Sequence, residues 1–272
     1  MRACLDILQV LGPAWVQDLG RPGHMSEGMP WGGAMVPELL LGGNLLLGNP
    51  GWAAGIEFFG QLRIRLPSGL RAACNGRLLP PQAEHELAPA AGQRLGVLAL
   101  SGGVDVPLCM QGRGTLPTVG IGGFQGRTLQ AGDALPLGQA PALPKTQGRL
   151  SAPDLQQPLP VYPGPDLQGF VSAAWDLLLQ QEWTLSAPSD RTGTRLKGPR
   201  LIWEGAQERP SMPMVAGAIQ VPPSGQPLVL GPDHPVTGGY PLIGVLPRSA
   251  LGSLHLRPLG GRVCFQAAEL SL

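Results

Sequence analysis

Glycine and proline recur so often in this chain that long helices are excluded from most of it. The 272 residues include 41 glycines and 31 prolines, and these are scattered between apolar runs. Proline removes a backbone donor, and both residues destabilise the interior of a helix. Hydrophobic residues make up 43% of the chain, which is enough for a core. The sequence therefore predicts a globular protein of short elements joined by many tight turns.

Short runs that are apolar or alternating, and that are bounded by Gly, Pro, Asn or Asp, predict β-strands. Regular strands separated by turns favour an all-β fold, a barrel or sandwich, over βαβ units. The predicted strands are 5–11, 58–66, 70–74, 95–100, 159–162, 201–203, 218–221, 227–230, 242–246 and 262–267.

Two stretches are typical of helices, so the expected fold is mainly β with two or three short helices. Residues 37–47 begin on a proline and end at Gly48-Asn49-Pro50, which are start and stop signals. Residues 166–181 carry apolar side chains at i, i+3 and i+4 spacing, and Asp166 could cap them.

A proline-rich stretch without periodicity divides the chain in two. The sequence predicts an N-terminal domain at 1–140, a linker at 141–158 and a C-terminal domain at 159–272. Residues 64–69 faintly resemble residues 219–225. Either an internal duplication or chance explains this similarity, because a chain rich in Gly and Pro produces such matches easily.

Composition argues against several functional classes. The net charge is +1, with 19 basic against 18 acidic residues, so no strong positive footprint indicates a nucleic-acid or anionic-membrane partner. Apolar stretches are interrupted by Gly or Pro, which favours a cytoplasmic protein outside the membrane. Cys4, Cys74, Cys109 and Cys264 form no CxxC motif, which favours free thiols in a reducing compartment.

Cofactor motifs are also absent from the sequence. The four histidines are isolated, so no metal site is expected. There is no P-loop, and the glycine-rich run 120–126 precedes a strand-like segment, which favours a turn over a phosphate site. Lys145 and Lys197 are the only lysines, and neither stands in a Met-Lys-Met context. The chain is therefore expected to carry no biotin of its own.

Three clusters place polar groups among glycines. They are residues 16–23, residues 186–199, and residues 217–222 together with Asp233 and 237–241. Backbone N–H groups beside paired glycines and hydroxyls suit an oxyanion or carboxylate ligand. The structural alternatives are a turn with a local Asp18–Arg21 ion pair, a solvated loop with a salt bridge, and a hairpin loop that closes a barrel.

Together with further motifs in the expected order, these clusters resemble the biotin-dependent carboxyltransferase family. The similarity is to its group of 5-oxoprolinase C subunits, also known as allophanate hydrolase subunit 2, which includes an antagonist of a sporulation-kinase inhibitor. It runs from about residue 8 to residue 265. The motifs are VQDLGR (16–21), GMPWGGAM (28–35), GNLLLGNPGWAAGIE (43–57), SGGVDVP (101–107), GIGGFQGR (120–127), YPGP (162–165), SDRTGTRLKGP (189–199), GAIQVPPSGQPLVL (217–230) and DHPVTGGYP (233–241).

The resemblance implies a fold of two cyclophilin-like β-barrels and an ATP-driven hydrolase that opens 5-oxoproline to L-glutamate. It implies the A and B subunits of that hydrolase as partners, with ATP bound by them or shared with them. Two other functions stay open. One is carboxyl transfer from a partner's carboxybiotin to urea or a similar acceptor. The other is a non-catalytic antagonist that binds a kinase inhibitor resembling the B subunit.

On this basis a cleft between the two barrels is expected to bind a small carboxylate. Arg21, Arg191 or Arg195 would anchor the carboxylate or a phosphate. The Gly238 and Gly239 amides with Thr237 would stabilise developing charge, and Asp233 or Tyr240 would transfer a proton. The candidate catalytic residues are Asp233, Tyr240 and Asp190. The candidate substrate-binding residues are Gln17, Asp18, Arg21, Arg191, Arg195, Gln220, Thr237, Gly238 and Gly239.

Several positions depart from the family pattern, at Val36, Leu116, Met212 and Pro235. The chain is also shorter than usual between Cys74 and Gln93. These changes imply a reduced or altered activity, or chemistry that depends on the retained Asp190, Arg191 and Asp233.

Overall fold

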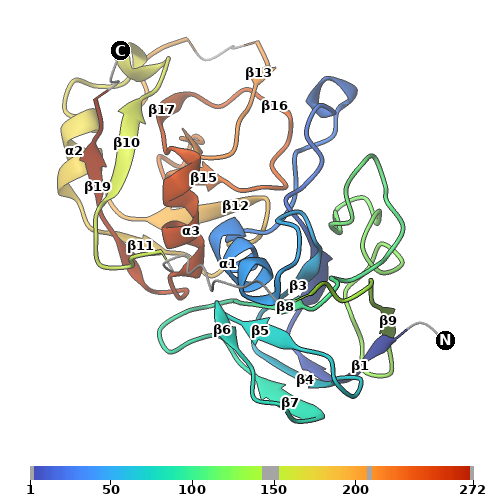
Figure 1. Cartoon of the computed structure of the whole chain (residues 1–272). Helices are drawn as coiled ribbons and strands as arrows, with labels where there is room; N and C mark the ends of the chain where they lie inside the picture. The colour runs from blue at the N-terminus through green and yellow to red at the C-terminus, as the bar shows by residue number, and fades with distance from the viewer. Residues whose placement is uncertain (1–2, 143–152, 207–209, 270–272) are drawn as a thin grey trace. The chain divides into compact units, whose positions relative to one another are not determined.

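The computed structural model describes residues 3–142, 153–206 and 210–269, and its fold is mostly β-strand with three α-helices (Figure 1). The expectation of a mainly-β protein with few short helices is confirmed. Two compact units divide the chain: residues 1–22 with 31–152 form unit 1, and residues 23–30 with 153–272 form unit 2. Most of the expected linker, residues 143–152, lies outside the described residues, and the domain limits stay a prediction.

Unit 1 contains two antiparallel sheets. Alternation builds its core: Leu62 and Ile64 of β4 are buried, whereas the neighbouring Arg63 and Arg65 are exposed. The four-stranded sheet has the order β7 (Glu84–Leu87), β4 (Gln61–Arg65), β1 (Cys4–Leu11), β9 (Ala134–Pro136). The five-stranded sheet has the order β2 (Ala14–Gln17), β3 (Gly55–Phe58), β8 (Gly96–Leu100), β5 (Ala72–Cys74), β6 (Arg77–Leu78).

The predicted helix at 37–47 is present as α1 (Pro37–Leu47), with a proline in its first turn. It ends at Gly48, whose φ of +73° is left-handed and whose N–H donates to the Asn44 and Leu45 carbonyls. The helix packs on β5 and β8. Gly43 permits this approach, because a Cβ there would lie 2.7 Å from the Cβ of Ala99.

Unit 2 is built on an eight-stranded sheet that curls into a nearly closed barrel (Figure 1). Its strand order is β18 (Arg262–Val263), β11 (Trp183–Leu185), β12 (Gly193–Lys197), β15 (Leu228–Leu230), β14 (Ala218–Gln220), β17 (Leu242–Val245), β10 (Leu159–Pro163), β19 (Phe265–Ala267). A small ribbon pairs β13 (Met212–Pro213) with β16 (Thr237–Gly238). The helices are α2 (Ala174–Gln180) and α3 (Arg248–Leu256), and short 3-10 turns stand at η1 (Met25–Glu27) and η2 (Leu167–Gly169).

The expected helix over 166–181 is wrong as a continuous element. The structure has η2, an extended residue at Phe170, and only then α2. Asp166 does not cap a helix, because its Oδ2 accepts the N–H of Leu242 at 2.8 Å. The expected strand at 201–203 is also absent, and only an isolated bridge joins Phe170 to Trp203. Their rings pack edge to face at 5.0 Å, so tertiary contacts outweigh the local periodicity.

Three other elements differ from the sequence predictions. The run 58–66 is divided between β3 and β4 by a turn at Gly60, whose φ is +81°. The segment 186–199, for which a solvated loop is the structural alternative, contains β12. Helix α3 has no counterpart among the predicted elements, because glycine and serine interrupt its apolar pattern; both are buried there.

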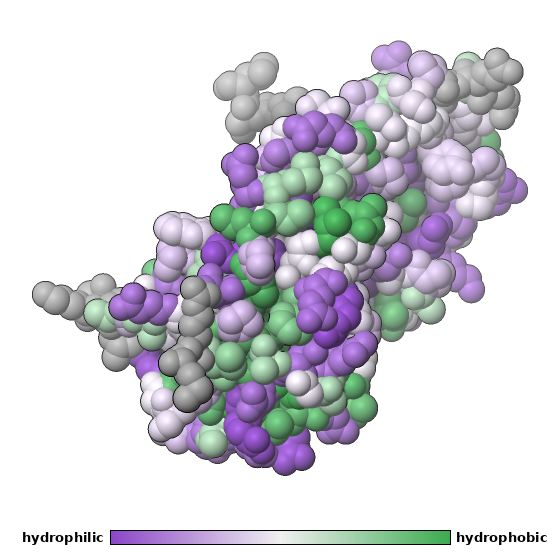
Figure 2. Space-filling model, turned by 90° about the vertical axis from the view of Figure 1, so that its right-hand side faces the viewer, coloured by the Kyte–Doolittle hydropathy of each residue, from purple (hydrophilic) through white to green (hydrophobic). Residues whose placement is uncertain are grey.

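Some large hydrophobic side chains are exposed at the surface. On the face drawn in Figure 2, hydrophobic side chains lie in small groups among hydrophilic ones. Exposed large apolar side chains such as Trp52, Leu108 and Val119 occur at separate points of the sequence, as is normal for folded proteins. Among the helices of the described segments, none is long and apolar enough to cross a membrane.

Candidate functional site

The first polar cluster, at the end of β2, is folded into the protein. Gln17 and Asp18 are buried. The Gln17 Nε2 donates to the Thr115 carbonyl at 2.9 Å. The two Asp18 oxygens accept backbone N–H groups, one from Gly20 at 2.8 Å and the other from Arg113. Asp18 therefore fixes the loop that follows β2 against residues 113–115.

Arg21 lies in the same cluster with only 1% of its surface exposed. Its Nη2 donates to the Gly114 carbonyl, and its Nε is buried without a hydrogen-bond partner among the described residues. Glycines make room for the guanidinium: a Cβ on Gly122 would lie 2.9 Å from Nη2. The run 120–126 forms turns, and the structure thus uses this glycine-rich segment to enclose an arginine.

The second cluster brings Arg191 together with Asp233. The Nε and Nη2 of Arg191 donate to the two oxygens of Asp233 at 2.7 and 2.9 Å. The side chains are 5% and 1% exposed, so this is a buried bidentate ion pair. The Asp190 Oδ1 accepts the N–H groups of Thr192 and Gly193 at 2.8 and 3.2 Å. The alternative of a solvated loop is therefore wrong for Arg191, whose partner lies in another segment.

His234 directly follows this ion pair. Its Nδ1 lies 2.7 Å from the Pro235 carbonyl, an acceptor, so the geometry assigns the proton of the neutral ring to Nδ1. Burial lowers the pKa of His234, while the Pro235 carbonyl and the charge of Asp233 oppose the shift. The imidazole is thus held mainly in its neutral form.

The third cluster is divided between buried and exposed residues. Gln220 of β14 is buried, and its Nε2 lies 3.4 Å from the Met214 sulfur. Gly238 of β16 packs on the same amide, since a Cβ there would lie 2.6 Å from it. Thr237 is exposed, and Tyr240 is 48% exposed. The glycine at 238 therefore permits a close approach between the β13–β16 ribbon and β14.

A pocket of about 500 Å³ in unit 2 includes two of the predicted residues, Gly239 and Tyr240. Sequence reasoning missed two others that line it, Arg200 and Trp203. The Arg200 Nη2 donates to the Pro223 carbonyl at 3.1 Å, and the Trp203 Nε1 donates to the Ala206 carbonyl at 3.2 Å. The remaining walls are mostly aliphatic side chains and prolines. The sequence offered one signal for these two lining residues: a basic and an aromatic side chain stand close to glycine and proline.

The predicted residues thus fall into separate groups. Unit 1 contains the buried set Gln17, Asp18 and Arg21. In unit 2 the pair Arg191–Asp233 stands with Asp190, Gln220 stands with Gly238, and Gly239 and Tyr240 line the pocket. Arg195 is exposed on β12. The substrate and catalytic roles of these residues stay predictions. No group of three or more His, Cys, Asp or Glu side chains suited to a metal ion occurs among the described residues.

Known proteins share the fold and the sequence pattern of this chain. The crystal structure of the K. lactis urea amidolyase superposes with a TM-score of 0.84 at 21% identity, covering 98% of this chain and 19% of that chain. The model of the family described as "Carboxyltransferase domain, subdomain A and B" matches residues 27–267. The chain belongs to this family, which confirms the resemblance drawn from the motifs.

Curated relatives extend the similarity along most of the chain. The 5-oxoprolinase C subunit of Escherichia coli K12 is 34% identical over 94% of this chain and 88% of its own length. The corresponding C subunit of Haemophilus influenzae is 34% identical over 98% of this chain and 92% of its own length. A putative urea carboxylase of Emericella nidulans is 28% identical over 98% of this chain, but over only 24% of its own length.

Proposed function

We propose that this chain is the C subunit of an ATP-dependent 5-oxoprolinase, a cytoplasmic hydrolase completed by its A and B subunits. The observation that carries the proposal is the 34% identity to two 5-oxoprolinase C subunits over most of both chains. In the reaction, water adds to the lactam carbonyl of 5-oxoproline and the ring C–N bond breaks. The nitrogen takes up a proton and becomes the amino group of L-glutamate.

The pocket of unit 2 offers the groups that this substrate needs. We assign Arg200 to its carboxylate, because the guanidinium lines the pocket and lies at the surface. The Gly239 amide would stabilise charge on the lactam oxygen, and the Tyr240 hydroxyl would donate a proton. The pocket volume of about 500 Å³ is within the range of small-molecule sites.

Arg191 and Asp233 have a different part in this proposal. Each satisfies the charge of the other inside the protein, so neither is available to a substrate without breaking the pair. The Asp233 N–H also donates to the Arg191 carbonyl at 3.1 Å. We therefore assign the pair a positioning role: it fixes the loop before Thr237, Gly239 and Tyr240.

ATP would be bound by the A and B subunits or at a site shared with them. The sequence contains no P-loop that would hold the phosphates within this chain alone. The chain on its own is expected to show no turnover. Its contribution would be the substrate pocket and a surface that the partners recognise.

The test is glutamate release from 5-oxoproline and ATP by the reconstituted A, B and C subunits, with each omitted in turn. Turnover should require this chain. Arg200→Gln should raise the KM for 5-oxoproline about tenfold or more, as loss of a charge-assisted hydrogen bond predicts. Tyr240→Phe should lower kcat. Arg262→Gln, 73% exposed and paired with Glu182, is the matched control and should change neither constant.

Turnover without this chain, or an unchanged KM in Arg200→Gln, would overturn the assignment. The similarity to the putative urea carboxylase favours carboxyl transfer as the second candidate. Exchange of carboxyl groups with a biotinylated partner, in the absence of glutamate release, would support it. A stable complex with the B subunit and no turnover in either assay would support an antagonist.

A further inference from the structure

The side-chain amide of Gln226 is bonded to the backbone of one other residue, Gly198. Its Oε1 accepts the N–H of Gly198 at 2.9 Å, and its Nε2 donates to the carbonyl of the same residue at 3.0 Å. Two residues that exchange a pair of such bonds form the repeating unit of an antiparallel ladder, and here a side chain takes the place of one strand. The amide therefore holds the backbone at Gly198 by two hydrogen bonds of fixed direction.

A side chain has this part because the ladder of backbone hydrogen bonds ends just before Gly198. β12 and β15 pair in antiparallel register, and the Leu196 N–H extends their ladder by donating to the Pro227 carbonyl at 2.9 Å. Pro227 has no N–H with which to return the bond. The same register would place Gly198 opposite Gly225, but the Gly225 N–H donates to the Pro222 carbonyl at 2.8 Å. The peptide groups of Gly198 are thus left to a side chain.

The short segment that follows Gly198 is held at further points. Gly198 packs on the buried ring of Trp183, since a Cβ there would lie 2.6 Å from the Cε3 atom. The Leu201 N–H donates to the Gly225 carbonyl at 2.9 Å. A Cβ on Gly225 would lie 3.0 Å from the Cβ of Arg200, so the turn lies directly against that arginine. Arg200 therefore stands between two fixed backbone positions.

Arg200 is the residue whose guanidinium we assign to the substrate carboxylate. Its Nη2 donates to the carbonyl of Pro223 at 3.1 Å, and no other hydrogen bond joins the guanidinium to the described residues. Its other N–H groups are thus available for a bidentate contact with a carboxylate. An arginine side chain loses much rotamer freedom when it is ordered. A guanidinium that is already placed before the substrate arrives binds more tightly for that reason.

We propose that Gln226 is a positioning residue for substrate recognition: its amide fixes Gly198, and thereby the Arg200 guanidinium, at the pocket of unit 2. The inference rests on the proposed function, because that function gives Arg200 its role. Gln226 does not line the pocket itself, so it acts through Arg200. Loss of the amide should therefore weaken substrate binding and leave the chemical step intact.

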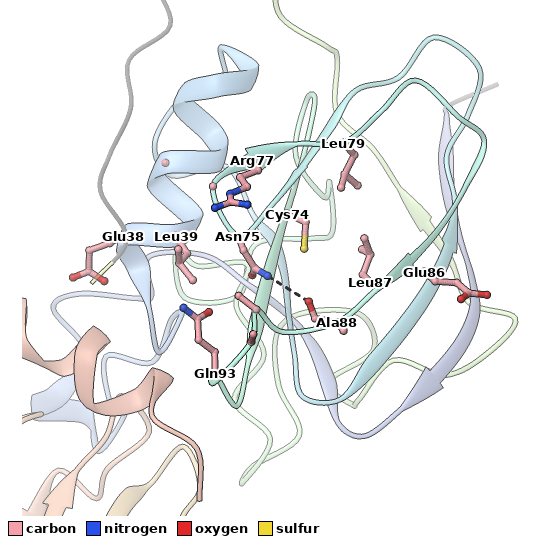
Figure 3. A pocket seen from close by; sticks show the side chains of 14 residues that line it. Glu38, Leu39, Cys74, Asn75, Arg77, Leu79, Glu86, Leu87, Ala88 and Gln93 are labelled. Atoms are coloured by element: carbon pink, nitrogen blue, oxygen red, sulfur yellow. Dashed lines mark hydrogen bonds between the residues drawn. The ribbon is translucent and has the colours of Figure 1, made fainter. Parts of the chain in front are cut away.

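Unit 1 contains a comparable amide that has no part in the proposed function. Asn75 stands in the hairpin between β5 and β6, beside a second pocket of about 840 Å³ (Figure 3). Its Oδ1 accepts the N–H of Val97 at 2.9 Å, and its Nδ2 lies 3.4 Å from the Ala88 carbonyl. Its φ of +49° is one that glycine adopts without strain. Asn75→Gly therefore removes an amide that holds backbone in the other unit, and it is the matched control.

The reconstituted A, B and C subunits test the proposal through the KM for 5-oxoproline. Gln226→Met keeps the length of the side chain and removes both hydrogen bonds to Gly198. It should raise the KM about threefold to tenfold and leave kcat unchanged, because a misplaced guanidinium weakens the binding of substrate and transition state alike. Combined with Arg200→Gln, it should raise the KM no further than Arg200→Gln does alone. Asn75→Gly should leave both constants unchanged.

Hydrogen exchange of the full chain, followed by mass spectrometry, reports on the same segment without the reaction. The amides of Gly198 and Leu201 should exchange about fivefold faster or more in Gln226→Met, as the loss of one hydrogen bond predicts. Asn75→Gly should leave their exchange unchanged. Circular dichroism checks that each variant is folded. If Gln226→Met is not, Gln226→Asn takes its place, because its amide is one methylene too short to make both bonds and should raise the KM in the same way.

The outcomes distinguish this inference from the function on which it rests. If Arg200→Gln raises the KM and Gln226→Met does not, the inference is wrong and the proposed function stands. A further increase of the KM in the double variant would also overturn the inference, since Gln226 would then act by another route. Unchanged exchange at Gly198 and Leu201 would do the same. If Arg200→Gln leaves the KM unchanged, the assignment of the pocket fails, and the inference fails with it.

Discussion

Arg21 of unit 1 and Arg191 of unit 2 are both buried and both come from polar, glycine-containing motifs, but the two guanidinium groups are held in different ways. In unit 1 Arg21 donates to the Gly114 carbonyl, its Nε has no partner, and no ion pair joins it to a carboxylate of the described residues. In unit 2 Arg191 forms a bidentate pair with Asp233. The comparison teaches that a motif of this kind does not reveal whether its buried arginine will pair with a carboxylate or with a backbone carbonyl.

The largest expected effect comes from breaking the pair of unit 2. Arg191→Met or Asp233→Asn should lower the free energy of unfolding by about 3–5 kcal/mol, because each change leaves the charge of the other residue buried without its opposite charge. Urea denaturation measures the loss. The double variant Arg191→Met/Asp233→Leu should cost much less than the sum of the single changes, since it leaves no buried charge.

The exposed pair Arg262–Glu182 provides the control for this prediction. Arg262→Met should change the free energy of unfolding by less than about 1 kcal/mol, because solvent screens such pairs. If neither single variant of the buried pair lowers the free energy of unfolding more than Arg262→Met does, the contrast between Arg191 and Arg21 disappears.

A smaller loss is expected at Arg21. Methionine has a similar shape and needs no hydrogen bond, so Arg21→Met removes a buried charge whose Nε is already without a partner among the described residues. The cost should be about 1–3 kcal/mol, the consequence of leaving the Gly114 carbonyl without its donor. Urea denaturation again provides the measurement, and binding assays for 5-oxoproline should be unaffected. A loss as large as that of Arg191→Met would mean that Arg21 has electrostatic support beyond the contacts described.

The difference between the two arginines also explains what can be predicted from the sequence. Helix α1 is predicted with its true limits because Pro37 and Gly48 are local signals. The partner of Arg191 lies 42 residues away and that of Asp166 lies 76 residues away, and no local pattern contains such contacts. The polar clusters are visible in the sequence, since glycines and charged residues stand together along it.

The residues that line a pocket cannot be predicted from the sequence for the same reason. Arg200 and Trp203 share a cavity with Tyr240 only because the segment after β12 and the segment between β16 and β17 are brought together by folding. Burial, rather than residue type, decides which polar side chains are free to bind.

The smallest expected effect is a dependence of the protein's stability on pH. It tests how well the loop of the buried Arg191–Asp233 pair excludes water, because His234 directly follows Asp233. Burial lowers the pKa of His234 below the usual 6.5, so the unfolded chain binds a proton that the folded chain resists. Between these two values the unfolded state holds more protons, and stability therefore increases with pH. The protein should be fully stable in this respect above about pH 6.5 and lose stability as the pH falls through the lower, folded value.

Urea midpoints measured from about pH 8 to about pH 5 should show this decline, a window that lies above the titration of ordinary carboxyl groups. His234→Asn should flatten it, because asparagine does not titrate. His24→Asn is the control, since that imidazole stands near the surface 3.2 Å from Glu27. A decline that persists unchanged in His234→Asn would show that another group causes it, and would contradict the assignment of the pH dependence to the ring beside Asp233.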